Sequence, residues 1–203
     1  MQMKKIAILI LACFVTPVHA DSIHDFESVT IGFKVTKPMQ WVFVSAEATL
    51  ENLKRIKMND EEFQELMLKY SKAPLVSMTK YKEPFDDINP SFKVNTKPLG
   101  QFKGEDPKKI FEVFLPHFQS LFADFELAQA PISTTVAGLD AAYMRVNYSI
   151  EVPDGREFAT TSEMWIVPRG NYFFMIGAGT REDEKTGSRD EIKSILNTIS
   201  FDE

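Results

Sequence analysis

Cysteine and histidine are scarce in this 203-residue sequence, and their scarcity excludes several kinds of site. The chain has one cysteine, Cys13, and three histidines. A disulfide within the chain and a zinc finger built from cysteine thiolates are therefore impossible. Beyond residue 20 the histidines are His24 and His117, about ninety residues apart and without the H-E-x-x-H spacing of a zinc protease. The sequence accordingly predicts no metal site.

Long hydrophobic runs are also lacking. The apolar run over residues 6–15 is far shorter than the roughly 20 residues that a membrane-spanning helix needs, and no later segment comes closer. This run follows two lysines and precedes a Val-x-Ala motif that ends at Ala20, which is the pattern of a secretory signal peptide. We therefore expect cleavage after Ala20, with residues 21–203 forming one domain in the periplasm or outside the cell.

A second interpretation of the N-terminus stays open. The stretch Ile10-Leu11-Ala12-Cys13 loosely resembles a bacterial lipoprotein box, in which Cys13 would be lipidated and would become the new N-terminus. The protein would then be anchored to a membrane through a lipid. Both interpretations place the protein outside the cytoplasm.

Basic residues are outnumbered along the chain. The sequence has 23 Lys and Arg against 29 Asp and Glu, a net charge of −6. Residues 21–203 retain 21 basic and 29 acidic residues, a net charge of −8. Because affinity for a phosphate backbone depends on clustered Lys and Arg, nucleic acid is not expected as a partner.

Glycine-rich phosphate loops are missing as well. The stretch FFMIGAGTRED at 173–183 reads as a strand that runs into two glycines, but Glu182 stands where a dinucleotide fingerprint needs its third glycine. The Gly-Lys-Ser/Thr of a P-loop is absent too. We expect instead that Gly177 and Gly179 let a helix or a neighbouring segment pack close to this strand.

Helical periodicity is present in three segments, which are residues 46–70, residues 107–122 and a final segment that begins at Ser188. Asp106 is the expected N-cap of the second, and Ser188 to Glu191 form a capping box for the third. The apolar side chains expected to face inward are Phe63, Leu66, Met67 and Tyr70; Ile110, Phe111, Phe114, Phe118, Leu121 and Phe122; and Ile192, Ile195, Leu196 and Ile199. Helices with such stripes cover a sheet.

The strands expected in the first half are short. They cover residues 28–36, 41–44 and 74–82, and residues 82–106 are expected to form a long irregular region because they contain three prolines and two glycines.

The second half alternates with period two from Glu126 onward. Strands over 139–152, 156–167 and 172–179 are separated by the turns PDG and PRGN, which predicts an antiparallel meander. The last strand is apolar on both faces, so both faces of the sheet must be covered. The expected fold is a three-layer α/β/α sandwich around a mainly antiparallel sheet.

Several segments of the sequence resemble those of one known protein superfamily. They are the Gly-Phe-Lys-Val of an early strand followed by Trp41, the segment KYKEPFDDINPSFKV, and the course from Gly138 to a final helix followed by Ser-Phe. The chain thereby resembles the Mog1/PsbP-like superfamily over most of residues 28–201. This resemblance implies the α/β/α sandwich and a noncatalytic accessory or binding role. PsbP itself helps a photosystem retain manganese, calcium and chloride, but no residue-level site of that role matches this chain.

One loop combines aromatic rings, carboxylates and an amide. Because long loops in compact domains often carry function, we expect a site for a partner protein or a ligand here. Ordinary packing of the two phenylalanines is the alternative. A Ca²⁺ ion could use the carboxylates and the amide, but the spacing lacks the EF-hand order and three ligands are too few. The site residues are Pro84, Phe85, Asp86, Asp87, Asn89 and Phe92.

The expected function is a noncatalytic, exported binding or accessory role, with another envelope protein as partner. The alternative is a carrier of a small or apolar ligand, with the Phe-rich helix over 107–122 as the roof of a cavity. A hydrolase is less favoured, because Gly187-Ser188 lacks the following glycine of a nucleophile elbow and His117 lies in a strongly apolar helix. No catalytic residue and no cofactor are predicted.

Overall fold

The computed structural model describes residues 24–45, 47–48, 74–152, 154–184 and 187–202. The expected signal peptide and lipoprotein box lie outside the described residues, as does nearly all of the first expected helix.

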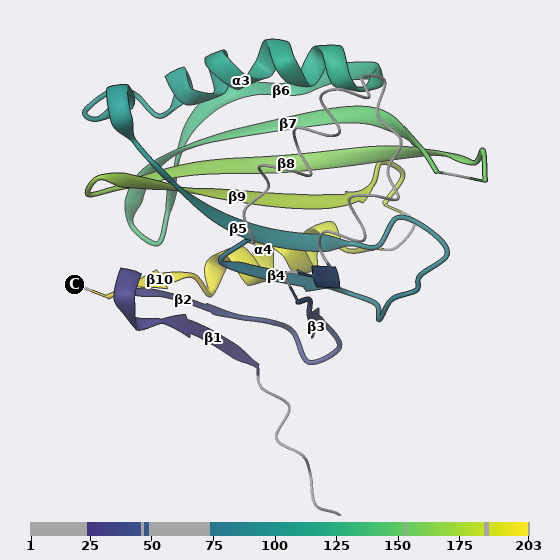
Figure 1. Cartoon of the computed structure of the whole chain (residues 1–203), viewed down its shortest axis with the longest axis horizontal. Helices are drawn as coiled ribbons and strands as arrows, with labels where there is room; N and C mark the ends of the chain where they lie inside the picture. The colour runs from purple at the N-terminus through teal and green to yellow at the C-terminus, as the bar shows by residue number, and fades with distance from the viewer. Residues whose placement is uncertain (1–23, 46, 49–73, 153, 185–186, 203) are drawn as a thin grey trace, which may run out of the picture.

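Within the described ranges, seven antiparallel strands form the main sheet in the order β3-β4-β5-β9-β8-β7-β6, and three more form a smaller sheet in the order β1-β2-β10 (Figure 1). The long strands β6 to β9 confirm the predicted antiparallel meander. The strands are β1 (Asp25–Ser28), β2 (Phe33–Thr36), β3 (Val42–Phe43), β4 (Val76–Thr79), β5 (Ser91–Pro98), β6 (Ala123–Val136), β7 (Leu139–Glu151), β8 (Glu157–Arg169), β9 (Tyr172–Arg181) and β10 (Ser200–Phe201).

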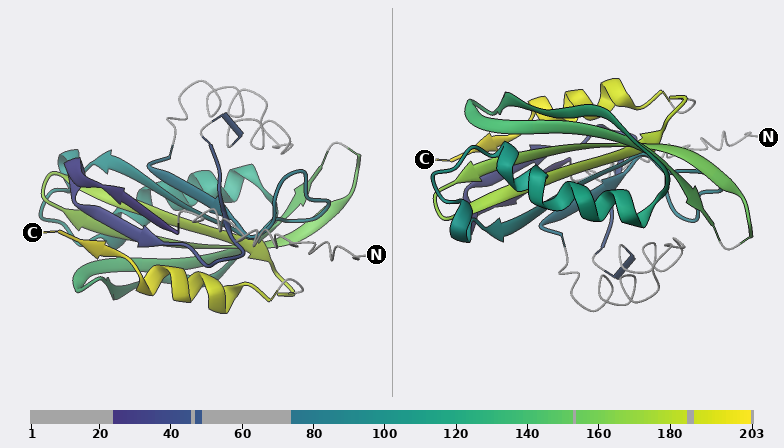
Figure 2. Two further views of the ribbon diagram at one scale, coloured as in Figure 1. Left: turned by 90° about the horizontal axis from the view of Figure 1, so that it is seen from below. Right: turned by 90° about the horizontal axis from the view of Figure 1, so that it is seen from above.

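Two described α-helices lie on opposite faces of the main sheet (Figure 2). They are α3 (Lys108–Leu121) and α4 (Arg189–Asn197), and two 3₁₀ turns, η1 (Val29–Ile31) and η2 (Gly100–Phe102), complete the described elements. The fold is therefore α+β with mostly antiparallel sheets. The full three-layer sandwich stays a prediction, because the helix expected over 46–70 is not described.

Alternation along the long strands divides the core into two layers. On β9, Phe173 packs with the cluster beneath α3, whereas Phe174 packs with the cluster between the main sheet, the small sheet and α4. Both rings are almost completely buried, at 4% and 3% exposure. The prediction that both faces of this strand are covered is thus confirmed.

The strand expected over 28–36 is wrong as a single element. Gly32 has a φ of 58° and ends the 3₁₀ turn η1, so the chain reverses between β1 and β2, which then pair with each other. The left-handed conformation at Gly32 suits glycine because it has no Cβ. This reversal brings Phe33 to the core, where its ring stacks on Phe174 at 5.5 Å.

The expectation that 82–106 is wholly irregular is also wrong. Residues 91–98 form β5, which lies between β4 and β9 in the main sheet. Phe92 and Val94 are fully buried in the core and alternate with the polar Ser91 and Lys93. This period-two pattern is the signal of a strand, but flanking prolines at 90 and 98 conceal it.

Helix α3 follows its prediction with two exceptions. Ile110, Phe111 and Leu121 are buried, but Phe114 is 36% exposed because it lies toward the outer side of the helix. The helix begins one residue later than predicted, so Pro107 and not Asp106 is its N-cap, although the Lys108 amide donates to the Asp106 carboxylate at 2.9 Å.

Helix α4 begins where the sequence predicts, but without the expected capping box. The Ser188 side chain makes no capping hydrogen bond. Instead the Lys80 ammonium donates to Ser188 Oγ at 3.2 Å and pairs with the Glu191 carboxylate at 2.8 Å. The side chains of Ser188 and Glu191, expected to form the capping box, therefore contact Lys80, the residue that follows β4.

Candidate functional site

A pocket of about 420 Å³ lies between the 81–90 loop and the face of the main sheet that also carries α3. We call it the loop pocket. Its volume falls in the range of roughly 300–1,000 Å³ typical of small-molecule sites. Its lining includes Ser77, Thr79, Glu83, Phe85, Asp87, Ile88, Asn89, Ser91, Lys93, Asn95, Phe118, Tyr148, Ile150, Ser162, Met164, Met175, Gly177 and Gly179.

Strand register builds the floor of the loop pocket. One row of directly paired residues crosses β4, β5, β9 and β8 as Ser77, Lys93, Gly177 and Met164. Directly paired residues in antiparallel strands point to the same face, with Cβ atoms about 5 Å apart. The row therefore places a hydroxyl, an ammonium group, an open position and a thioether side by side.

Two groups in this row have no partner in the described part of the protein. Ser77 is only 3% exposed, and its hydroxyl makes no hydrogen bond. Lys93 is partly buried, and none of the hydrogen bonds or ion pairs of the described residues involves its ammonium group. Burial lowers the pKa of Lys93 from its ordinary value. An unpaired cation and an unpaired hydroxyl thus adjoin at one end of the loop pocket.

The glycines of the floor leave space. A Cβ atom added at Gly177 would meet no atom within 4 Å, so the expected close packing of a neighbouring segment is wrong at this position. At Gly179 the prediction is nearer to the structure, since a Cβ atom would lie 3.2 Å from Ser91 Oγ. The first glycine opens the pocket, and the second accommodates the neighbouring strand.

The 81–90 loop is held by its own side chains. The Asn89 amide accepts from the Tyr81 backbone N–H at 3.0 Å and donates to the Tyr81 carbonyl and to the Glu83 carboxylate, both at 2.8 Å. The other Glu83 oxygen accepts from the Phe85 N–H, and the Phe85 ring stacks on Tyr81 at 4.4 Å. These contacts occupy both Glu83 oxygens and fix the loop above the sheet.

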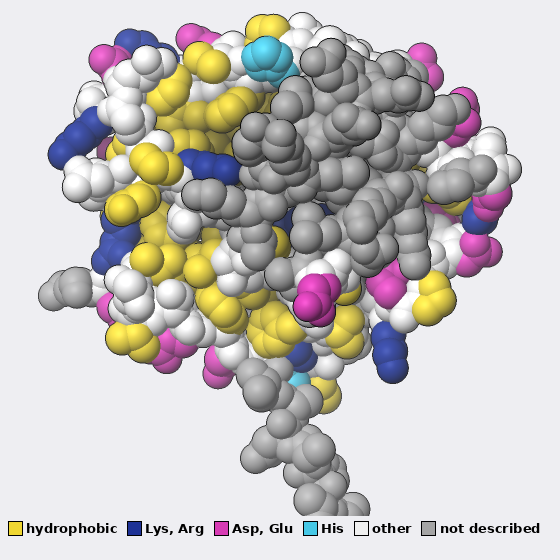
Figure 3. Space-filling view, viewed as in Figure 1, with side chains coloured by type: hydrophobic (Ala, Val, Ile, Leu, Met, Phe, Trp, Pro, Cys, Tyr) yellow, Lys and Arg dark blue, Asp and Glu magenta, His cyan; other side chains and the backbone are white. Residues whose placement is uncertain are grey.

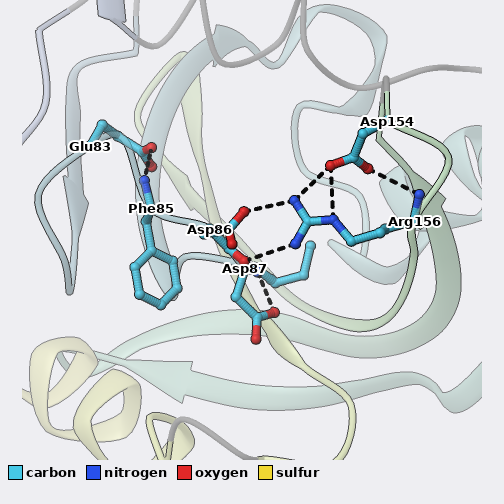
Figure 4. A network of polar contacts seen from close by, with 7 residues as sticks. Glu83, Phe85, Asp86, Asp87, Asp154 and Arg156 are labelled. Carbon is cyan, nitrogen blue, oxygen red and sulfur yellow. Dashed lines mark hydrogen bonds and ion pairs between the residues drawn. The ribbon is translucent and has the colours of Figure 1, made fainter.

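Two arginines, Arg156 from the connection between β7 and β8 and Arg181 from the end of β9, form ion pairs with the acids of the loop. Arg156 pairs with Asp86 at 2.7 Å and with Asp154 at 2.8 Å, and Figure 4 shows the two carboxylates on either side of its guanidinium group. Hydrogen bonds to these two carboxylates raise the pKa of Arg156, so it keeps its charge at any physiological pH. Arg181 Nε lies 3.5 Å from the carboxylate of Asp87.

The structure separates the six predicted site residues into three groups. Phe85, Asp87 and Asn89 line the loop pocket. Pro84 and Asp86 are exposed on the outer side of the loop. Phe92 lies in β5 and is fully buried in the core on the other face of the sheet.

Sequence reasoning missed the residues of the floor. Ser77 and Lys93 stand in short strands whose alternation is readable, as Val-Ser-Met-Thr and Ser-Phe-Lys-Val, but their adjacency depends on the pairing of β4 with β5. The polar positions in these buried strands are the signal that could have indicated a site.

The opposite end of the loop pocket is more apolar. Phe118 at the end of α3 lines it together with Ile150 and Met164. Tyr148 lies under Phe122, with ring centroids 4.1 Å apart, and its hydroxyl is hydrogen-bonded to Ser162 at 2.7 Å. Figure 3 shows further apolar side chains gathered beneath α3 on the left of this face. The pocket is thus polar at β4 and β5 and apolar near α3.

The described residues do not form a metal site, a site at His117 or a membrane-spanning helix. No group of three His, Cys, Asp or Glu side chains there could hold a metal ion. His117 is exposed on α3, apart from the loop pocket, and its carbonyl accepts a hydrogen bond from Ser120. None of the described helices is both long and apolar enough to cross a membrane.

Comparisons with known proteins were informative only for structure. No protein-family model matches the sequence, and no curated protein is similar to it in sequence. The chain is similar to LpqN of Mycobacterium tuberculosis with 12% identity and a TM-score of 0.51, over 84% of this chain and 83% of that one. It is similar to cyanobacterial PsbP (CyanoP) of Synechocystis sp. PCC 6803 with 12% identity and a TM-score of 0.50, over 93% and 99%.

The Ran-binding protein Mog1p of Saccharomyces cerevisiae also aligns, with 11% identity and a TM-score of 0.47, over 87% of this chain and 94% of that one. At such low sequence identities, structural similarity shows a shared fold, and function must be argued from the residues of the site. The chain therefore has the Mog1/PsbP-like fold that the sequence predicted.

Proposed function

We propose that this chain is a noncatalytic binding protein of the cell envelope, exported by its N-terminal segment, and that it holds a small, partly apolar ligand in the loop pocket. The observation that carries this proposal is the buried Ser77 hydroxyl without a partner on the floor of an open pocket. A buried polar group without a hydrogen bond costs about 1–3 kcal/mol, and a ligand that bonds to it removes this cost.

The architecture of the pocket favours binding over chemistry. Its acids are occupied, because Glu83 accepts two hydrogen bonds within the loop, Asp87 faces Arg181 and Glu163 accepts a hydrogen bond from Tyr143. No nucleophile paired with a base is assembled among its described residues. The likeness to LpqN, which is described as involved in cell envelope biogenesis, is in keeping with an envelope role and with the signal peptide expected over residues 1–20.

Native mass spectrometry of the protein purified from cells tests this proposal. We expect a bound mass in the wild type and its loss in Gly177→Val, because the added side chain fills the floor of the loop pocket. Gly177 has no positive φ and open space around it, and valine suits a strand, so this variant should remain folded. A bare polypeptide mass, together with no thermal shift from fatty acids, sugars or nucleotides, would count against the proposal.

A protein partner at the outer side of the loop is the second candidate function. Asp86 favours it, because its side chain is 90% exposed although it is paired with Arg156. Crosslinking in intact cells with wild type and Asp86→Ala would test it, with Asp154→Ala as the matched control, since that residue contacts the same arginine. A crosslinked envelope protein that persists in Asp86→Ala would argue against docking through this residue.

A further inference from the structure

The lining of the loop pocket is polar at one end and apolar at the other. At β4 and β5 the lining carries the Ser77 hydroxyl and the Lys93 ammonium group, and toward α3 it carries Phe118, Ile150 and Met164. A ligand that complements such a pocket has a polar head and an apolar body.

The head must be anionic, because the unpaired charge is a cation. The acids nearest to the pocket are used elsewhere: Glu83 bonds to Phe85 and Asn89, and Asp87 accepts from the Ile88 N–H at 2.6 Å and faces an arginine. None of the described acids forms an ion pair with Lys93. A partly buried ammonium group without a counterion is stabilised by an anion that enters the pocket.

The number of donors selects the kind of anion. The subsite offers one ammonium group and one hydroxyl on directly paired residues, Ser77 and Lys93. A carboxylate carries one negative charge over two oxygens, which matches these two donors, whereas a phosphate carries more charge and three oxygens. Phosphate sites also commonly use arginine forks or helix N-termini, and neither is found among the lining residues that the structure describes.

We propose that Lys93 and Ser77 form a carboxylate subsite in the loop pocket, so that the ligand is an amphipathic carboxylic acid. This inference rests on the proposed function and adds the chemical class of the ligand. The open position at Gly177 lies next to Lys93 in the same row and gives the carboxylate room to approach. The apolar part of the acid then lies over Met164 and beneath Phe118.

Isothermal titration calorimetry with four probes of one chain length tests the subsite. The probes are decanoate, decanol, decyl phosphate and decyltrimethylammonium, which differ only in the head group. We expect decanoate to bind the wild-type protein at least about tenfold more tightly than decanol, because a hydrogen bond to a charged group is lost with the alcohol. Decyltrimethylammonium should bind most weakly, since its charge repels Lys93.

Two lysines of β5 provide a matched pair of variants. Lys93→Gln should abolish the preference for decanoate over decanol while decanol still binds. Lys97→Gln should keep the preference, because Lys97 lies on the same face of the same strand but outside the lining of the loop pocket. Ser77→Ala, a nearly isosteric change, should weaken decanoate binding severalfold and serves as a second variant if Lys93→Gln does not fold.

The outcomes separate the subsite from the proposed function. Equal affinity of the wild type for decanoate and decanol would overturn the carboxylate subsite and leave ligand binding intact. Tighter binding of decyl phosphate than of decanoate would overturn the assignment of a carboxylate. Failure of all four probes to bind the wild type would contradict the proposal of a partly apolar ligand as well as the subsite.

Discussion

The Tyr143 hydroxyl donates a 2.6 Å hydrogen bond to the carboxylate of Glu163, across the paired strands β7 and β8. Glu163 is only 4% exposed, and the indole of Trp165 packs beside the phenol with ring centroids 5.2 Å apart. Arg189 Nε, at the start of α4, lies 3.6 Å from the same carboxylate. A buried charge is therefore held by one hydrogen bond and one ion pair from different elements.

Replacing Tyr143 with phenylalanine should destabilise the protein by about 1.5–3 kcal/mol, because a hydrogen bond to a charged, buried group is lost without a change of shape. Urea unfolding measures this difference. Tyr172→Phe is the control, since Tyr172 is 54% exposed, and it should leave the free energy of unfolding nearly unchanged. Equal effects of the two variants would contradict a stabilising role for the Tyr143 hydrogen bond.

The same tyrosine predicts a loss of stability at high pH. Burial and the bond to Glu163 raise the pKa of Tyr143 well above its ordinary value of 10. The folded state thus holds this proton more tightly than the unfolded state, so stability is complete below pH 10 and falls as the pH rises above it. Unfolding measured from pH 8 to 11 should show this fall, and the fall should be shallower in Tyr143→Phe. Identical slopes would exclude Tyr143 as a contributor.

The meander of β7, β8 and β9 was predictable because long strands repeat the period-two signal many times. Met144 and Val146 share one face of β7, as the period-two pattern predicts, and the structure shows that this face packs toward α3. The strand β5 was missed because only eight residues carry its signal and Pro98 ends it. Here the pairing of β5 with its neighbours decided the structure and outweighed the local preference of proline for loops.

The loop pocket could not have been predicted from the sequence. Ser77, Lys93 and Gly177 become neighbours through the register of β4, β5 and β9, and a shift of one residue would place all three on the opposite face. Asp87 was identified as a site residue, but its partner Arg181 is almost a hundred residues away in the sequence. The local sequence pattern identified the loop. The pairing of strands that are distant in the sequence determined which residues form the pocket floor beneath it.

Two matched acids in the first turn of α4 should differ in their effect on stability. Glu191 forms an ion pair with Lys80 at 2.8 Å and accepts a hydrogen bond from Gln40 at 2.6 Å, and its side chain is 23% exposed. Asp190 pairs only with Lys193 among the described contacts, and its side chain is 94% exposed. Because exposed pairs contribute little, Glu191→Gln should cost about 1 kcal/mol and Asp190→Asn much less. Chemical denaturation of both variants measures this, and a larger cost for Asp190→Asn would contradict the account.

The two arginines that fasten the 81–90 loop should not be equivalent. Both guanidinium groups lie over the ring of Phe158, but the Arg181 side chain is 17% exposed and that of Arg156 is 47% exposed. Arg181→Ala should therefore open the loop, and hydrogen exchange of its amides should become faster. Arg156→Ala should change the exchange little, since exposed ion pairs are screened by water and salt. Equal acceleration in both variants would show that the exposed pair also holds the loop.

The affinity for decanoate should decrease as the pH rises, if Lys93 binds its carboxylate. Burial lowers the pKa of Lys93, so its ammonium group loses the proton at a lower pH than an ordinary lysine does. Only the protonated form attracts a carboxylate. The dissociation constant should consequently increase as the pH rises through that lowered pKa, by up to about tenfold for each further unit.

The other ionisable groups around the loop pocket should not produce this dependence of decanoate binding on pH. Among the residues that the structure describes, they are the acids Glu83, Asp87 and Glu163, and the phenol Tyr148. Burial raises the pKa of Tyr148, so its hydroxyl stays neutral between pH 7 and pH 10. Calorimetry should therefore give a pH-dependent dissociation constant for decanoate, a constant one for decanol, and neither trend in Lys93→Gln. A flat decanoate profile in the wild type would show that the Lys93 ammonium group does not bind the carboxylate.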